Sequence, residues 1–73
     1  MQFIYKPRAE EIHVQFKSED LSIHIVDMAG RVIKTMSGNS SLLLISVADI
    51  QVGEYAVMIS GGRVAGTYMF VKH

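Results

Sequence analysis

The sequence feature that most constrains the fold is the stretch Leu21–Thr35, LSIHIVDMAGRVIKT, which has alternating apolar residues before and after a short turn. From Leu21 to Ile25 every second residue is apolar, the pattern of a β-strand with one buried face. In the turn, Asp27 can accept hydrogen bonds from the backbone that follows it, and Gly30 can adopt a positive φ. The stretch therefore predicts a β-hairpin with a type I turn closed by a glycine bulge.

Five further stretches have the composition of β-strands, which gives about seven strands in all. They are residues 3–5, 11–16, 41–47, 54–60 and 63–72. The first is short, because Pro7 restricts itself and its neighbour to extended or turn geometry, and a proline in a sheet belongs at an edge or at the start of a strand. Residues 41–47, SLLLISV, lack polar alternation and predict a strand that is covered on both sides.

Polar and glycine-containing segments separate these strands. Residues 17–20 and 36–40 predict loops, and Gly61–Gly62 predicts a two-residue hairpin turn. Residues 48–53 look like a connector with at most one helical turn, and no window has convincing helical spacing. The sequence therefore predicts an all-β fold, a small antiparallel β-sandwich, with a partly open barrel as the alternative and with the strand order left open.

Composition excludes several classes of function. The chain of 73 residues fits one small domain, and without cysteine it has neither a disulfide nor a zinc–cysteine site. Seven basic and seven acidic residues give a net charge of zero, which argues against a nucleic-acid partner. The longest aliphatic run, residues 42–45, is too short for a membrane-spanning segment. The first seven residues do not resemble a signal peptide, so we expect an exported chain to be a mature piece or an excised domain.

Candidate chemical sites are few. His13 and His24 occupy outward positions on strands that could be neighbours, with Glu11 close in sequence. Catalytic zinc needs three positioned ligands and a second shell, so solvent-facing histidines are the better interpretation. Residues 61–67 lack the lysine and the following helix of a phosphate-binding loop, and no serine has the context of a nucleophile. We therefore expect no catalytic residue, no cofactor and no metal, and hence no enzyme.

Three ordered stretches together resemble a known family. LSIHIVDMAGRVIKT resembles its D-x-x-G-[KR] hairpin block, SVADIQVGEYAVMI its L-x-x-G-x-Y block, and TYMFVKH its terminal strand with a basic residue. The family is the C-terminal sorting domain of cargo of the type IX (Por) secretion system in Bacteroidota. The resemblance spans residues 11–73 and places the family's terminal block at the end of the chain.

The resemblance implies an immunoglobulin-like sandwich that serves as a folded, non-catalytic secretion signal. Such domains direct larger proteins from the periplasm to the outer-membrane surface or the extracellular space. The implied partners are proteins of the machinery: an outer-membrane shuttle, the translocon and a surface sortase that usually removes the domain. Two alternatives are a domain retained by a surface component of that machinery, and a generic immunoglobulin-like or fibronectin-like spacer or adhesion module.

The resemblance also assigns roles to individual residues. The positions that match its turns and blocks are Asp27, Gly30, Arg31, Gly53, Tyr55 and Lys72. Gly30 and Gly53 are expected to serve the fold through a positive φ. Arg31 and Lys72 are the candidates for recognition by another protein, on the premise that charge at a turn or terminus contributes little to a core.

The front of the chain departs from the family pattern, because the segment around Tyr5 and Pro7 keeps only one proline. We therefore expect a sorting domain at residues 11–73 and a linker or first edge segment, with an uncertain boundary, at residues 1–10. The strand at residues 67–72 is a plausible docking element, since a partner can add a strand to an exposed edge. Edge-paired or swapped dimers of the isolated domain are possible by the same physics.

Overall fold

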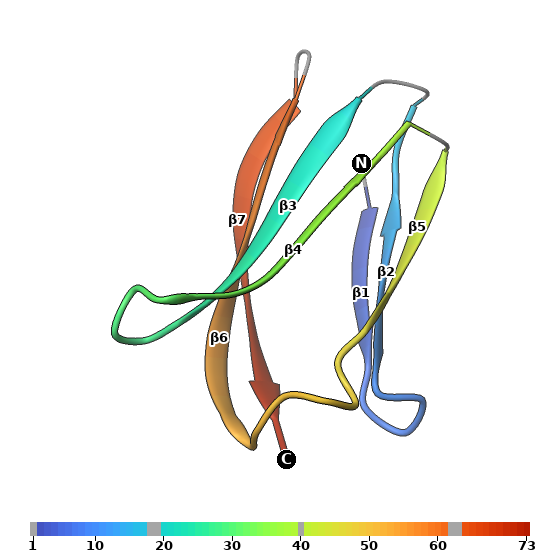
Figure 1. Ribbon diagram of the computed structural model, residues 1–73. Helices are drawn as coiled ribbons and strands as arrows, with labels where there is room; N and C mark the ends of the chain where they lie inside the picture. Colours follow the sequence, from blue (N-terminus) through green and yellow to red (C-terminus); the bar gives the residue numbers. More distant parts are fainter. Residues whose placement is uncertain (1, 18–19, 40, 62–63) are drawn as a thin grey trace.

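The computed structural model describes residues 2–17, 20–39, 41–61 and 64–73, and in these residues it contains seven β-strands and no helix (Figure 1). The strands are β1 (Gln2–Lys6), β2 (Glu11–Gln15), β3 (Leu21–Asp27), β4 (Val32–Gly38), β5 (Leu42–Ser46), β6 (Gly53–Gly61) and β7 (Val64–Lys72). They form two packed sheets, one in the order β1-β2-β5 and one in the order β4-β3-β6-β7. The predicted all-β sandwich is confirmed.

The strand order, which the sequence left open, is that of an antiparallel sandwich with crossing connections. Every hydrogen-bonded neighbour is antiparallel, and the connections β2–β3, β4–β5 and β5–β6 each pass from one sheet to the other. β4 lies beside β3 in the larger sheet, whereas the fourth strand of an antibody constant domain lies beside the fifth. The strand at the front of the chain, β1, is an edge strand of the smaller sheet.

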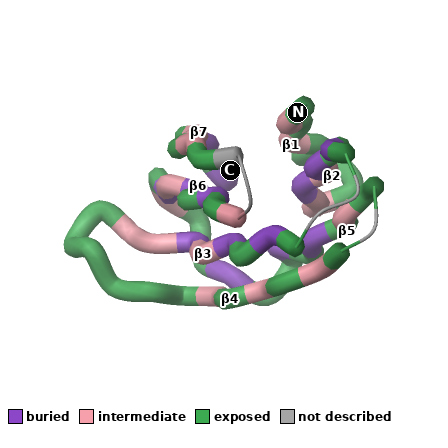
Figure 2. Tube along the Cα trace, turned by 90° about the horizontal axis from the view of Figure 1, so that it is seen from above, coloured by how far each residue is buried: buried purple, intermediate pink, exposed green. Residues whose placement is uncertain are grey.

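The core lies between the two sheets and follows from the alternation in the sequence. Successive side chains of a strand point to opposite faces, so every second residue reaches the interior. Figure 2 shows buried residues recurring along strands of both sheets. The most deeply buried apolar side chains of the strands, at most 2% exposed, are Ile12, Val14, Leu21, Ile23, Ile25, Ile45, Val57 and Ile59.

Aromatic rings join the edge strands of the two sheets. Phe3 of β1 stacks on Tyr68 of β7 with ring centroids 4.7 Å apart, and Tyr5 contacts Phe70 at 4.9 Å. Tyr55 of β6 stacks on the other side of this group, 5.5 Å from Phe70. Because such pairs contribute about 0.5–1.5 kcal/mol each beyond the area they bury, they close the β1–β7 side of the sandwich.

Three expectations from the sequence need correction or qualification. β5 is not covered on both sides: it is an edge strand, and Leu42 and Leu44 are about half exposed. An apolar run fixes burial on one face only, and here the inner face is Leu43 and Ile45. The loop predicted at residues 36–40 is shorter, because β4 continues to Gly38. The turn predicted at Gly61–Gly62 lies partly outside the described residues; Gly61 itself belongs to β6 and pairs with Val64.

Two neighbouring residues of β5 test this arrangement. We expect Ile45→Ala to lower the free energy of unfolding by roughly 2–5 kcal/mol, because Ile45 is fully buried. Leu44→Ala is the matched control and should cost less than about 1 kcal/mol, since Leu44 is 50% exposed on the outer face. Denaturant unfolding of both variants measures the difference, and equal losses would contradict the assignment of β5 as an edge strand with one buried face.

Candidate recognition site

The turn of the β3–β4 hairpin is built around the side chain of Asp27. Its Oδ1 accepts hydrogen bonds from the backbone N–H groups of Ala29 (3.0 Å) and Arg31 (2.9 Å), and its Oδ2 accepts one from Arg31 Nε (3.0 Å). The Asp27 carbonyl accepts from Gly30 N, and Asp27 N donates to the Arg31 carbonyl. Gly30 has φ +86°, a conformation that costs an L-residue about 1–2 kcal/mol. The predicted turn chemistry is therefore present.

The hairpin presents a fixed tip to the outside. It projects beyond the two sheets in Figure 1. The Arg31 side chain is 80% exposed and bonds to Asp27 through Nε, so the forked end of the guanidinium is accessible to solvent. Met28, Val32 and Ile33 are also exposed around it. Because the backbone bonds to Asp27 hold the turn, a partner would meet an ordered cation with apolar neighbours.

The electrostatics of the turn favour the charged carboxylate. The hydrogen bond from Arg31 N–H lowers the pKa of Asp27 below its ordinary value of 3.8, against a partial opposing effect of desolvation. The bonds from the Arg31 guanidinium and from Ala29 N–H lower it further. Asp27 therefore stays ionised at neutral pH and holds both the turn and the base of the Arg31 side chain.

The second motif block forms a tyrosine corner where β6 begins. Tyr55 is buried, and its hydroxyl donates a 2.6 Å hydrogen bond to the carbonyl of Gln51, four residues upstream. A tyrosine that bonds back to the preceding connection is a hallmark of immunoglobulin-like sandwiches. Gly53, between the two, has φ +155°. Tyr55 and Gly53 thus fix the conformation of the connection between the sheets and do not form an exposed recognition surface.

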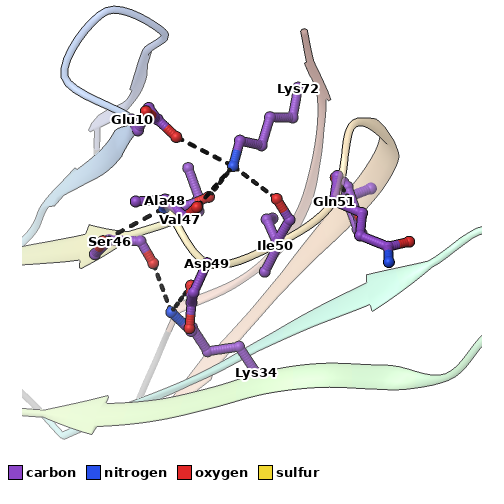
Figure 3. A network of polar contacts seen from close by, with 10 residues as sticks. Glu10, Lys34, Ser46, Val47, Ala48, Asp49, Ile50, Gln51 and Lys72 are labelled. Atoms are coloured by element: carbon purple, nitrogen blue, oxygen red, sulfur yellow. Dashed lines mark hydrogen bonds and ion pairs between the residues drawn. The ribbon is translucent and has the colours of Figure 1, made fainter.

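Lys72 lies inside the molecule, which corrects the premise that its charge does little for the core. The residue is buried, and its Nζ donates to the carbonyls of Val47, Ala48 (3.2 Å) and Ile50 (2.7 Å) (Figure 3). It also forms an ion pair with Glu10 at 3.2 Å. A lysine is almost never this buried unless paired, and here the hydrogen-bond and ion-pair partners of Nζ are all oxygen atoms.

A second lysine holds the same loop from its other side. Lys34 Nζ of β4 donates to the carbonyl of Ser46 (2.7 Å) and to Asp49 Oδ1 (2.8 Å) (Figure 3). The hydrogen bond from Lys34 lowers the pKa of Asp49 below 3.8. Lysines from two strands of the larger sheet thus bind the loop that leaves the smaller sheet.

The motif residues therefore fall into two separate groups. Asp27, Gly30 and Arg31 form the hairpin tip, whereas Gly53, Tyr55 and Lys72 surround the connection between the sheets. Sequence reasoning missed Glu10 and Lys34. Lys34 lies two residues before inward-facing Met36, and Lys72 lies two residues after inward-facing Phe70. Because residues two apart in a strand point to the same face, this spacing indicates that both lysines face inward. No comparable pattern pointed to Glu10.

The two histidines do not meet. His13 is in β2 of the smaller sheet, where its Nε2 lies 3.1 Å from Glu11 Oε1, and His24 is in β3 of the larger sheet, 3.2 Å from Thr35 Oγ1. Within the described ranges, no three side chains of histidine, cysteine, aspartate or glutamate are grouped as metal ligands. The same part of the chain contains no helix that could span a membrane.

The lowered pKa of Asp27 predicts a pH dependence of stability. A carboxylate with a depressed pKa in the folded state stabilises the fold above its unfolded pKa, near 3.8, and loses that contribution as pH falls through the folded pKa. We expect wild type to exceed Asp27→Ala in unfolding free energy near neutral pH, and the difference to shrink below 3.8. Denaturant unfolding across the acid range measures this difference in unfolding free energy. The contribution of Asp49 cancels from it because both proteins contain that residue. A difference that persists unchanged in acid would contradict the prediction.

Comparison with known proteins identifies the family of this fold. The family described as "Secretion system C-terminal sorting domain" matches residues 5–72, nearly the whole chain. In the other two comparisons, no curated protein and no solved structure matched. The match includes the hairpin tip, the tyrosine corner and Lys72, and it begins within β1. The chain belongs to the family of type IX secretion C-terminal sorting domains, which mark proteins for export to the cell surface or the extracellular space.

Proposed function

We propose that this domain is a non-catalytic signal that the outer-membrane translocation and attachment machinery recognises in its folded form. The family match over residues 5–72 is the observation that carries the sorting role. The proposed partners are the outer-membrane shuttle, the translocon and the surface sortase. Two surfaces of the domain support direct recognition, the hairpin tip around Arg31 and the free edge of β7.

The hairpin tip fits a protein partner with a carboxylate beside an apolar pocket. The exposed forked end of Arg31 matches a carboxylate in geometry and charge, and Met28 and Val32 add apolar contact. Methionine side chains adapt to irregular surfaces, so such a tip tolerates imperfect shape complementarity. The Asp27 bonds hold the turn before binding, which reduces the entropy lost on docking.

The edge of β7 fits a partner that adds a β-strand. β7 has nine residues and pairs on one side only, with β6. Natural edge strands are usually protected by charge, proline, a bulge or short length. β1 and β5 have only five residues each, and β4 contains Lys34 and an irregular register with β3. The one charged residue of β7, Lys72, is the last residue of the strand, so residues 64–71 of this edge lack all four forms of protection.

A reporter fusion tests the sorting role. Residues 1–73 fused to a periplasmic reporter in a type IX host should deliver the reporter to the surface or the medium. Retention of the wild-type fusion in the periplasm would overturn the proposal. Delivery with the domain still attached would favour a retained domain of the machinery, and removal of the domain would favour ordinary cargo. Equal delivery in a host without type IX secretion would favour the spacer or adhesion module.

Blocking the free edge should prevent docking without unfolding the domain. Met69→Lys places a charge on the outer face of β7, where Met69 is exposed, and we expect surface delivery to fall at least about tenfold. Met58→Lys is the matched control, since Met58 is exposed on the same face but in central strand β6. Equal export of both variants would argue against edge docking. Deleting residues 67–73 should also block export, but it removes core residues as well.

A charge variant tests the hairpin tip. Arg31→Ala should reduce surface delivery, because it removes the exposed guanidinium, while the thermal midpoint of the isolated domain changes by less than about 5 °C. Lys17→Ala removes an exposed charge elsewhere and should export normally. Normal export of the Arg31 variant would exclude this residue as a recognition contact. Sedimentation of the wild-type domain checks whether its free edge also forms dimers.

A further inference from the structure

We propose that the loop at residues 47–50 and the carboxylate of Glu10 form a binding site for a primary ammonium group. Lys72 is its resident ligand and acts as a latch that fastens the last strand to the connection between the sheets. This site does not depend on the sorting role. It gives the terminal basic residue of the family, here Lys72, binding partners inside the domain. The inference rests on the number, type and position of the atoms around Nζ.

The atoms around Lys72 Nζ match an ammonium group. An ammonium has three N–H donors and no acceptor. The carbonyls of Val47 and Ile50 accept the two shortest hydrogen bonds, and the carbonyl of Ala48 and Glu10 Oε2 lie at 3.2 Å. All four partners are oxygen acceptors. The Lys72 side chain is only 8% exposed, so these oxygens replace almost all of its hydration.

Glu10 provides an independent sign that the site is built for a cation. It has φ +53°, a conformation in which a residue other than glycine is uncommon. Its carbonyl accepts a 2.8 Å hydrogen bond from Val47 N, so backbone and side chain both hold it against the loop. Glycine would adopt this backbone more easily but would supply no carboxylate. The strained glutamate thus places a carboxylate against Lys72 Nζ, whereas the carboxylate of Asp49 in the same loop pairs with Lys34.

The geometry discriminates between cations. A guanidinium is planar and directs its donors outward in a fork, whereas these acceptors converge on one nitrogen. A partner protein that recognises only an exposed positive charge would bind arginine and lysine equally well. The buried site, by contrast, requires a compact ammonium, so Lys72→Arg separates the two roles.

The latch also bears on how β7 is presented. Lys72 connects the end of β7 to the loop after β5 and to the turn between β1 and β2. Its release would free one end of the edge strand that we propose for docking. This consequence rests on the proposed function. If β7 is the docking strand, a domain without the Lys72 contacts would hold that strand less firmly and would be exported less efficiently.

Chemical modification of the wild-type domain tests the site directly. With a limiting amine-acylating reagent followed by peptide mass spectrometry, Lys6 and Lys17 serve as exposed internal controls. Lys72 should react at least about tenfold more slowly, because it is reached only through local opening. Modification of Lys72 at the rate of Lys17 would overturn the site. This measurement needs no variant, so a folding defect cannot obscure it.

Variants and chemical rescue test the specificity. Lys72→Met should lower the thermal midpoint by at least about 10 °C, since it leaves the loop carbonyls without their donor and the Glu10 carboxylate without its cation. Lys34→Met is the matched control and should cost less, because Lys34 is more exposed. Lys72→Arg should also be destabilised. In Lys72→Ala, propylammonium, which replaces the three carbons and the nitrogen removed, should restore part of the midpoint, whereas tetramethylammonium, which has no N–H donor, should not.

The outcomes separate this inference from the sorting role. Wild-type stability in Lys72→Met or Lys72→Arg, or equal effects of the two ammonium compounds on Lys72→Ala, would overturn the ammonium site and leave sorting untouched. A wild-type fusion that stays in the periplasm while Lys72 resists acylation would overturn sorting and leave the site standing.

Discussion

The whole structure depends on the contact between the inner faces of two small sheets. A domain of this size buries only about 60% of the surface of its unfolded chain, and without a disulfide every strand must contribute. Side chains such as Ile12 and Val57 supply this contact, but the loop that crosses between the sheets exposes carbonyls that apolar residues cannot satisfy. Lys34 and Lys72 provide the missing donors. The contact between the sheets therefore needs both the apolar core and the hydrogen bonds from the two lysines to the loop.

Much of the fold could be predicted because alternation reports directly on which face of a strand is buried. The β3–β4 hairpin and the seven-strand sandwich follow from such local patterns. The pattern fails for β5, where Leu42 and Leu44 are apolar on an outer face. Sheet order and edge positions depend on long-range pairing, to which local alternation is blind. These features determine which strands have an unpaired edge.

The candidate site was only half accessible from sequence, for a physical reason. Arg31 follows a recognisable turn, and a turn residue is exposed whatever the sheet order. The environment of Lys72 is assembled from Glu10 and from a loop more than twenty residues away, mostly through main-chain carbonyls. Backbone acceptors leave no signature in residue type. A terminal lysine therefore looked like a surface charge until the loop around it was visible.

The stacked rings of Phe3 and Tyr68 have a consequence for the timing of folding. They join strands that lie at opposite ends of the sequence, so their contact closes nearly the longest loop that the chain allows. Closing such a loop costs entropy before any packing is gained, and folds rich in distant contacts form slowly. The sandwich is thus complete only after β7 has been added, and a chain that lacks it has unpaired rings on β1. A complete sandwich therefore forms only on chains that have been synthesised through β7.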